Sequence, residues 1–219
     1  MTEKLETSKV NVMLLDNCLK NWQAINWRQV QGRVNQLRQR IFRATAKGDK
    51  KKVGRLQRLM MRSTANKLMS IRKVTVTNRG RQTAGVDGET ALSNQERILL
   101  LDRIGKYSCN QVRPVKRIYI PKGTNKYRPL GIPTILDRCQ QMIIKNALEP
   151  YWEAQFEAIS YGFRPGRSTH DAIKRVYNVV RSKGKRSWIV DADIEGAFDH
   201  ITHEHILKRV GNFPGREWI

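Results

Sequence analysis

A long stretch with almost no negative charge places the strongest constraint on this chain. Between Arg28 and Gln82 there are 17 lysines and arginines and a single acidic residue, Asp49. Such an excess repels itself in a compact fold unless the charges lie on an exposed surface or are neutralised by a polyanion. The whole chain of 219 residues carries a formal net charge of +23. Nucleic acid therefore fits as a partner better than a membrane surface does.

Apolar residues recur at helical spacing within this basic stretch. Residues 28–46 and 50–72 each show the pattern, and "KGDKKK" separates them. The spacing predicts a basic helical hairpin. Its RNA-binding residues are predicted to be Arg33, Arg38, Arg40, Arg43, Lys50, Lys51, Lys52, Arg55, Arg58 and Arg62. The alternative is a solvated charged face that binds nothing.

A Gly-rich polar stretch, "NRGRQTAGVDGET", follows the basic region and is typical of a loop. It predicts a boundary between two domains. The first is a basic helical N-terminal extension, residues 1–82, and the second covers residues 83–219.

The chain shows no sign of a membrane-spanning or secretory segment. No stretch reaches the roughly 20 apolar residues that span a bilayer, and the N-terminus has mixed charge without an apolar signal core. Cys18, Cys109 and Cys139 are widely spaced and form no CxxC motif. These features predict a cytoplasmic protein with reduced thiols and no membrane partner.

The second domain is predicted to mix strands and helices. Residues 116–132 read as two strands around a turn at 123–125, and an apolar helical pattern covers about 137–156. Ser168 is a good cap for the next helix, with Asp171 three residues on. The buried stripe of that helix is predicted to contain Ile173, Val176, Tyr177 and Val180.

Residues 187–201, "SWIVDADIEGAFDHI", combine an apolar run with three aspartates. If residues 187–194 form a strand, Asp191 and Asp193 share one of its faces. A carboxylate at the end of an apolar strand is costly to desolvate without a partner, and a divalent cation is the usual one. Asp199 is expected to cap a helix that follows.

The end of the chain carries two weaker signals. His200, His203 and His205 lie partly on different faces of the expected helix with no cysteine near, so they do not predict a zinc site. The final "FPGREWI" predicts a turn, after which Trp218 and Ile219 have nothing to pair with. That ending resembles a cut through a larger domain.

Four segments resemble consecutive blocks of one family. They are "TAGVDGET", "RIYIPKGTNKYRPLGIPTILDRCQQ", "YGFRPGRSTHDA" and "DADIEGAFDHI", in this order. Together they resemble the reverse transcriptases of group II introns, and the basic segment before them is similar to the N-terminal extension of these intron-encoded enzymes. The resemblance implies an α+β fold: right-hand polymerase fingers and the start of the palm, preceded by the basic helical extension.

The resemblance assigns roles to residues of the last block. The family's first palm motif, Asp-x-x-x-x-Phe/Tyr, matches Asp193 through Phe198. It implies that Asp193 is catalytic and ligates two Mg²⁺ ions, with the carbonyl of Ile194 as a further ligand. Phe198 would lie under the sugar of the incoming nucleotide and exclude a 2′-hydroxyl, unless it is an ordinary core residue. The small Ala197 would let the substrate approach closely, and Asp191 corresponds to no family ligand.

The resemblance also assigns the predicted strand pair to the incoming nucleotide. Lys122 and Arg128 match residues that contact its triphosphate, for which Lys supplies a point charge and Arg a bidentate donor. The alternative is a solvent-facing basic hairpin. Arg164 and Arg167 could serve template or nucleotide, and their roles stay open. Weaker candidates are Lys116, Arg117 and Lys126.

Two functions are compatible with these residues. One is the N-terminal part of a reverse transcriptase and maturase, which uses an RNA template, a DNA primer and deoxynucleoside triphosphates, binds its group II intron RNA and assists splicing. The other is a non-catalytic module that binds intron RNA. The family's second catalytic block, Tyr-x-Asp-Asp, does not occur in the sequence. These 219 residues alone are therefore predicted to lack a complete active site.

Overall fold

The computed structural model describes residues 21–219 apart from 124–125, 182–187 and 199. A helical body is formed by α2 (Trp27–Ala46), α3 (Lys50–Arg62), α4 (Thr64–Arg72), α5 (Asn94–Lys106) and α6 (Ile135–Glu153). The chain also forms strands β1 (Lys116–Pro121) and β2 (Tyr127–Ile132), and helices α7 (Thr169–Val180) and α8 (His203–Val210). Single turns of helix occupy Trp22–Ala24, Lys73–Thr77, Arg79–Gln82, Cys109–Gln111 and Arg216–Trp218.

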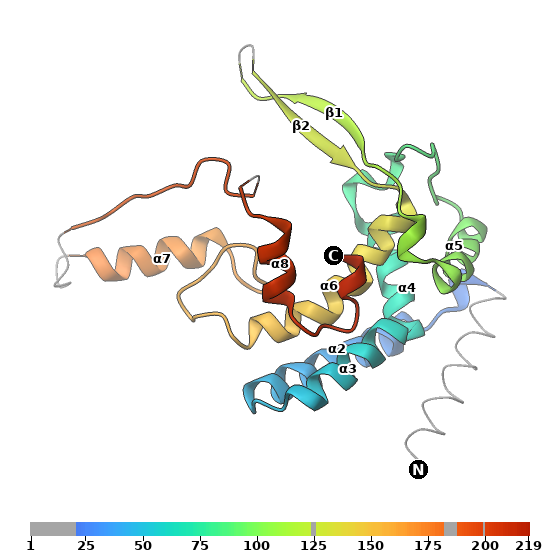
Figure 1. Cartoon of the computed structure of the whole chain (residues 1–219), viewed down its shortest axis with the longest axis horizontal. Helices are drawn as coiled ribbons and strands as arrows, with labels where there is room; N and C mark the ends of the chain where they lie inside the picture. The colour runs from blue at the N-terminus through green and yellow to red at the C-terminus, as the bar shows by residue number, and fades with distance from the viewer. Residues whose placement is uncertain (1–20, 124–125, 182–187, 199) are drawn as a thin grey trace.

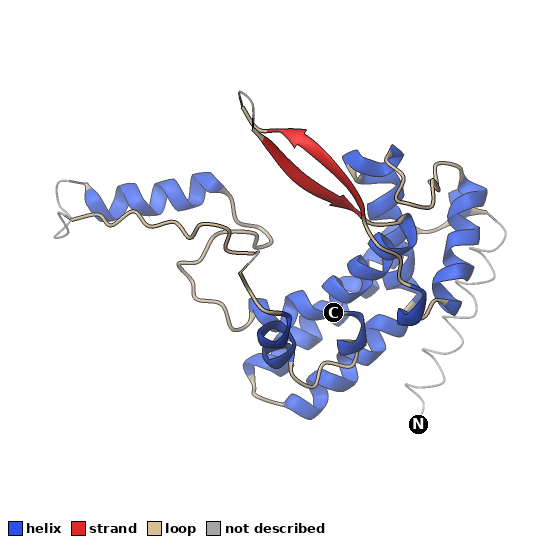
Figure 2. Ribbon diagram, turned by 45° about the horizontal axis from the view of Figure 1, so that its top comes forward, coloured by secondary structure: helices blue, strands red, loops and turns tan. Residues whose placement is uncertain are grey.

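The β-hairpin and α7 both extend away from the helical body (Figures 1 and 2). Among the described residues the sheet contains only β1 and β2. The described part of the chain is therefore mainly helical, with one small antiparallel sheet. No helix in the described ranges is long and apolar enough to cross a membrane.

The predicted basic hairpin is present as α2 and α3, which pack against each other. Gly48 adopts a positive φ of 72° in the connection, a conformation that suits glycine. Asp49, the single acid of this stretch, caps α3, since its side chain accepts the amide of Lys52 at 2.9 Å. The predicted helix over 50–72 is two helices, because Ser63 between them is extended (φ −66°, ψ 123°).

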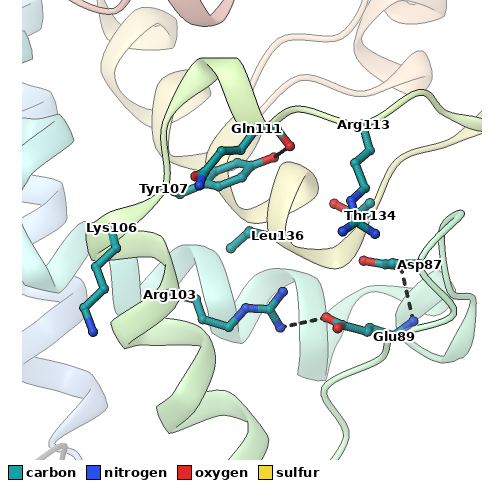
Figure 3. Close-up of a pocket in the computed structure, with 9 residues that line it drawn as sticks. All are labelled: Asp87, Glu89, Arg103, Lys106, Tyr107, Gln111, Arg113, Thr134 and Leu136. Atoms are coloured by element: carbon teal, nitrogen blue, oxygen red, sulfur yellow. Dashed lines mark hydrogen bonds and ion pairs between the residues drawn. The ribbon is translucent and has the colours of Figure 1, made fainter.

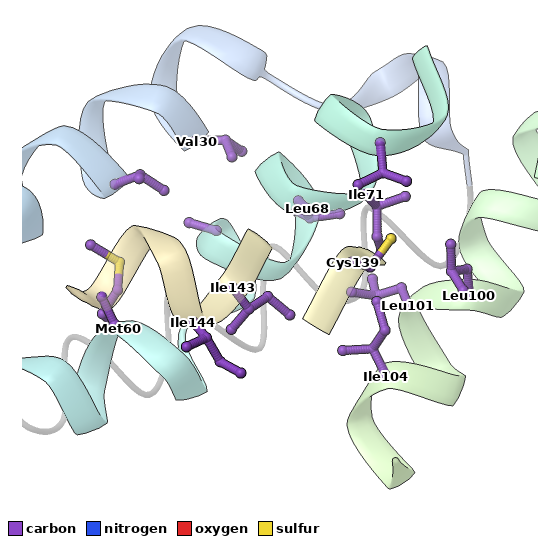
Figure 4. Close-up of a cluster of buried hydrophobic side chains, with 14 of the residues drawn as sticks. Val30, Met60, Leu68, Ile71, Leu100, Leu101, Ile104, Cys139, Ile143 and Ile144 are labelled. Atoms are coloured by element: carbon purple, nitrogen blue, oxygen red, sulfur yellow. The ribbon is translucent and has the colours of Figure 1, made fainter. Parts of the chain in front are cut away.

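The core is built around α6, which packs against α2, α3, α4 and α5. Figure 4 shows the apolar side chains of these helices converging on it, with Ile143 and Ile144 of α6 at the centre. Burial raises the pKa of the Cys139 thiol to about 12, so the side chain packs as a small apolar group. The helices on both sides of the predicted domain boundary at residue 82 thus share one hydrophobic core.

A buried polar network fixes the register of α6 against the basic hairpin. Asn66 of α4 donates to the carbonyl oxygens of Met60 at 3.0 Å and Ile143 at 3.2 Å. Its own side-chain oxygen accepts from Asn146 of α6 at 2.7 Å. Arg38 of α2 donates to the Asn146 oxygen at 3.4 Å and forms an ion pair with Glu149. Buried polar groups that are satisfied in this way specify one arrangement of the helices.

Two predictions for the C-terminal third are wrong. The described part of the expected strand, residues 188–194, is irregular and exposed, with Trp188 92% and Val190 90% accessible. A strand needs a neighbour to satisfy its backbone, and none of the described residues pairs with this one. Helix α7 starts at the predicted capping box of Ser168 and Asp171, but its apolar stripe is not buried. The stripe residues are exposed: Ile173, Val176, Tyr177 and Val180.

The end of the chain is better packed than its sequence suggests. Phe213 belongs to the core cluster, and the ring of Trp218 lies 5.5 Å from that of Tyr107. The prediction that Trp218 lacks a partner is therefore wrong. Thr202 caps α8 by accepting the amide of His205 at 3.3 Å. The expected cap, Asp199, lies outside the described residues.

Candidate nucleotide and nucleic-acid interface

The pairing of β1 with β2 decides which side chains of the hairpin share a face. Ile120 lies opposite Arg128, and the amide of Lys122 donates to the carbonyl of Lys126 at 2.6 Å, which extends the pairing by one step. Side chains alternate between the two faces along each strand. Lys122, Lys126 and Arg128 therefore share one face at the free end of the hairpin, and all three are exposed. The turn includes Gly123, whose φ is 78°.

The block "TAGVDGET" holds the base of this hairpin in place. A Cβ at Gly85 would lie 2.7 Å from the Cα of Thr134 and 2.9 Å from the carbonyl oxygen of Pro133, so only glycine permits the contact. Arg138 of α6 donates to the carbonyl oxygens of Pro133 at 2.9 Å, Gly80 at 3.1 Å and Thr83. One guanidinium thus joins the loop before the block to the end of β2. The sequence offered no signal for this role.

We expect Arg138→Ala to destabilise the chain by about 2–3 kcal/mol, because hydrogen bonds to a charged group are worth ~1.5–3 kcal/mol and three carbonyl oxygens lose their donor. Chemical denaturation monitored by circular dichroism measures this. The matched control is Arg103→Ala, whose exposed ion pair with Glu89 at 2.7 Å is worth about 0–1 kcal/mol. Equal losses in the two variants would contradict the role of Arg138.

A cavity of about 300 Å³ lies beside this junction (Figure 3). Its lining mixes acids, such as Asp87 and Glu89, with cations, such as Arg103 and Arg113. Tyr107 donates from its hydroxyl to Asp137, and burial together with this bond raises the pKa of the phenol. Because its charges largely offset one another, the cavity does not favour a polyanion.

The segment predicted to carry the metal ligand lies on a loop. Asp193 is exposed and its carboxylate accepts the amide of Ile194 at 3.0 Å. Among the described residues no three histidine, cysteine, aspartate or glutamate side chains come together as a metal site would require. Phe198 is 81% exposed, which does not fit a core residue, and Ala197 beside it is half-buried. In Figure 1 the segment before α8, which carries these residues, lies apart from strands β1 and β2.

The predicted RNA-binding cations of α2 and α3 fall into two groups. Arg38 is half-buried and committed to Glu149 and Asn146, and Arg33 is also half-buried. The other eight are exposed on the outer surface of the helical hairpin: Arg40, Arg43, Lys50, Lys51, Lys52, Arg55, Arg58 and Arg62.

Arg164 and Arg167, whose roles the sequence left open, hold the loop after α6. Arg164 is buried and forms two bonds to the Glu153 carboxylate, at 3.0 and 2.7 Å. This pairing raises the pKa of Arg164 and lowers that of Glu153. Arg167 donates to the carbonyl of Ala158 at 2.8 Å and lies over the ring of Tyr161. Phe163, directly before Arg164, adopts a positive φ of 56°.

Comparison with known proteins places these segments in one family. A family model described as the N-terminal domain of reverse transcriptase matches residues 22–104. A second, described as reverse transcriptase (RNA-dependent DNA polymerase), matches residues 120–219. The second match includes the hairpin end with Lys122 and Arg128 and the loop with Asp193. The two matches together cover most of the chain.

Three curated proteins illustrate the similarity. Protein YkfC of Escherichia coli is 37% identical over 71% of this chain and 43% of its own length. Group II intron-encoded protein LtrA of Lactococcus lactis is 40% identical over 60% of this chain and 22% of its own length. Maturase-like protein 1 of Euglena gracilis is 29% identical over 86% of this chain and 42% of its own length. The chain spans less than half the length of each relative. From both family matches and these relatives, the chain belongs to the reverse transcriptases and maturases of the group II intron-encoded type.

Proposed function

We propose that this chain is the N-terminal part of an RNA-directed DNA polymerase of the group II intron type, which also binds its intron RNA and assists splicing. The observation that carries the proposal is the strand register, which gathers Lys122, Lys126 and Arg128 on one exposed face of the hairpin. That hairpin lies within the segment that matches the reverse transcriptase model.

The hairpin cations suit the triphosphate of an incoming deoxynucleotide. Residues two apart on a strand are about 6.5–7 Å apart and point to the same side, so Lys126 and Arg128 address neighbouring phosphates of one ligand. Arg128 can bind a phosphate through two parallel bonds, and Lys122 across the turn adds a compact charge. In this proposal Phe198, whose side chain is exposed, and its neighbour Ala197 meet the sugar of the same nucleotide.

Magnesium stays a prediction for this chain. One exposed carboxylate, Asp193, and the carbonyl of Ile194 do not hold two divalent ions, and the described residues contain no further ligand cluster. Mg²⁺ favours several carboxylate, phosphate and water oxygens. We propose that Asp193 is one ligand of a site to which other carboxylates must contribute, and that the 219 residues alone do not catalyse nucleotide addition.

The second activity, intron binding, rests on the eight exposed cations of the helical hairpin. They bind a folded RNA through its phosphates, whether or not an active site is complete. A non-catalytic maturase-type module would bind RNA through the same cations. This is the alternative function, and it applies if the complete protein also lacks catalysis. RNA template, DNA primer and deoxynucleoside triphosphates are the further partners of the polymerase proposal.

Lys122→Ala and Arg128→Ala should each reduce kcat/KM for deoxynucleotides by about 10- to 150-fold, the loss of one charge-assisted phosphate contact. The assay is primer extension on an RNA template by a polypeptide that also supplies the C-terminal region of the longer relatives. Lys106→Ala, which removes an exposed lysine of α5, is the matched control. If nucleotide kinetics stay unchanged while primer–template affinity falls, the hairpin holds the duplex and the proposed role is wrong.

A further inference from the structure

A cavity of about 270 Å³ lies at the turn of the helical hairpin. The buried Ala44, the carboxylate of Asp49 and four cations line it. The four cations are Arg40, Arg43, Lys47 and Lys52. All four are exposed, so a ligand reaches them from solvent. Figures 1 and 2 show the turn between α2 and α3 at the edge of the molecule, away from the β-hairpin.

Helical spacing brings three of these cations together. Arg43 follows Arg40 by three residues, and Lys47 follows Arg43 by four, so their Cβ atoms succeed one another about 5–6 Å apart on one face of α2. Lys52, in the first turn of α3, completes the lining from the other helix. Like charges at this spacing destabilise a helix. The arrangement therefore costs stability unless an anion neutralises it.

No carboxylate of the described residues neutralises this group. Five ion pairs occur in the described part of the chain, and none of them includes a cation of the cavity. The carboxylate of Asp49 is engaged as a helix cap, since it accepts the amide of Lys52 at 2.9 Å. With four cations against one carboxylate, the cavity retains an excess of positive charge that favours an anion.

Backbone hydrogen bonds hold the turn in one conformation. The amide of Gly48 donates to the carbonyl oxygen of Thr45 at 2.9 Å, and the amide of Asp49 donates to that of Ala44 at 3.0 Å. The amide of Lys47 donates to the carbonyl oxygen of Arg43 at 3.2 Å. Because the backbone around the cavity is already fixed, a bound anion orders only side chains, which lowers the entropic cost of binding.

We propose that this cavity binds a compact di- or triphosphate group. Each of the two arginines can hold a phosphate through two parallel bonds, and the two lysines add point charges. A phosphodiester of a nucleic-acid strand carries a single charge, whereas linked phosphates bring several charges within reach of all four cations. The volume is below the roughly 300–1,000 Å³ of sites for drug-sized ligands, so the cavity accommodates the phosphates and leaves any attached nucleoside outside.

This inference rests on the proposed function, because Arg40, Arg43 and Lys52 also belong to the surface that we assign to intron RNA. It extends that assignment to a ligand of different chemistry, which withdraws these three cations from contact with RNA. The group has two sources, a free di- or triphosphate and the 5′-triphosphate end of an RNA. Residues 55, 58 and 62, whose arginines are exposed on α3, do not line the cavity. The RNA anchor is therefore tested apart from the cavity.

Isothermal titration calorimetry of the 219-residue chain with tripolyphosphate tests the proposal, at about 150 mM salt to screen charges beyond ~8 Å. The double variant Arg43→Gln/Lys47→Gln should weaken binding by about 10-fold or more, because charge-assisted bonds to phosphate are lost. The matched control Arg55→Gln/Arg58→Gln removes the same charge from exposed positions outside the cavity. It should change the affinity by less than about threefold, as expected for exposed charges at a distance.

Asp49→Asn should have the opposite effect. Asparagine caps helices as well as aspartate does, and the variant removes the one negative charge at the cavity. The affinity for tripolyphosphate should therefore rise by about threefold or more. Equal losses in the two double variants overturn the proposal, since they report net charge alone. An unchanged or weaker affinity of Asp49→Asn also overturns it.

Two RNAs of one sequence, with a 5′-triphosphate or a 5′-hydroxyl, distinguish the sources of the group. If the cavity takes an RNA end, the chain prefers the triphosphate RNA, and Arg43→Gln/Lys47→Gln abolishes the preference. Equal binding of the two RNAs, together with binding of tripolyphosphate, assigns the cavity to the free anion. If the cavity proposal fails, the salt dependence of RNA binding in variants of Arg55, Arg58 and Arg62 still tests the RNA anchor.

Discussion

The affinity of this chain for structured RNA should fall by about 10³–10⁵-fold between 50 and 200 mM monovalent salt. That range applies to duplex DNA when six to ten phosphates are contacted, and eight of the predicted RNA-binding cations are exposed on α2 and α3. Each phosphate that a cation neutralises releases a condensed counterion, so added salt opposes binding. Folded RNA can differ in slope but not in sign. Filter-binding titrations across salt measure the effect.

Charge-neutral variants locate the contact surface. Arg55, Arg58 and Arg62 are exposed on α3, and their spacing places them on one side of the helix. Replacing all three by glutamine should reduce the log–log salt slope by about 3, at ~0.9 for each lost phosphate contact. The control removes three exposed cations from the C-terminal region: Lys208, Arg209 and Arg216. Equal slopes for the two triple variants, or a flat response of the wild type, would refute the RNA-anchor proposal.

Charge-neutral substitutions test the contact surface more cleanly than a deletion of residues 1–82 does. Helices α2, α3 and α4 contribute Val30, Met60, Leu68 and Ile71 to the core around α6. Removing them would expose the apolar faces of α5 and α6 and leave Asn146 without its partner Asn66. Loss of RNA binding in such a deletion would report unfolding as readily as a lost contact.

Local signals in the sequence predicted the elements that local interactions determine. The helical hairpin follows from apolar spacing, with "KGDKKK" between its two halves. The capping box of Ser168 and Asp171 starts α7 where expected. The strand over 187–194 was wrong because a strand depends on a distant partner, which an apolar run cannot reveal. The apolar stripe of α7 was predicted to be buried and is exposed for the same reason, since its burial also depends on a distant partner.

Arginines show the corresponding limit at the candidate site. Arg38, Arg138 and Arg164 are indistinguishable in sequence from Arg40, Arg55 or Arg58, yet each is committed to other parts of the fold. Arg38 pairs with Glu149, Arg164 with Glu153, and Arg138 with three backbone carbonyls. The exposed arginines of α2 and α3 have the same side chain, but in our proposal they contact RNA phosphates. Which arginines remain free for phosphate depends on tertiary packing, which residue type and spacing do not encode.

Asp193→Asn should reduce primer extension by about 10³-fold or more while RNA binding changes little. The substitution keeps the size of the side chain, and the amide oxygen can still accept the backbone amide of Ile194. The lost property is one negative charge. Removing a single group that stabilises charge in a transition state costs about 10²–10³-fold, and a carboxylate that ligates a divalent ion is a stronger case. The assay uses the polypeptide that supplies the C-terminal region of the longer relatives.

The neighbouring Asp191 provides the matched control for this prediction. It is also exposed, lies two residues away on the same loop, and corresponds to no ligand in the family motif. Asp191→Asn removes the same charge from the same region and should leave extension within about threefold of wild type, as expected for a surface substitution. If Asp193→Asn retains activity within about tenfold, its carboxylate is not a ligand. If both variants lose activity equally, the loss comes from the charge of the loop and not from Asp193 itself, since only a ligand position distinguishes two carboxylates so close together.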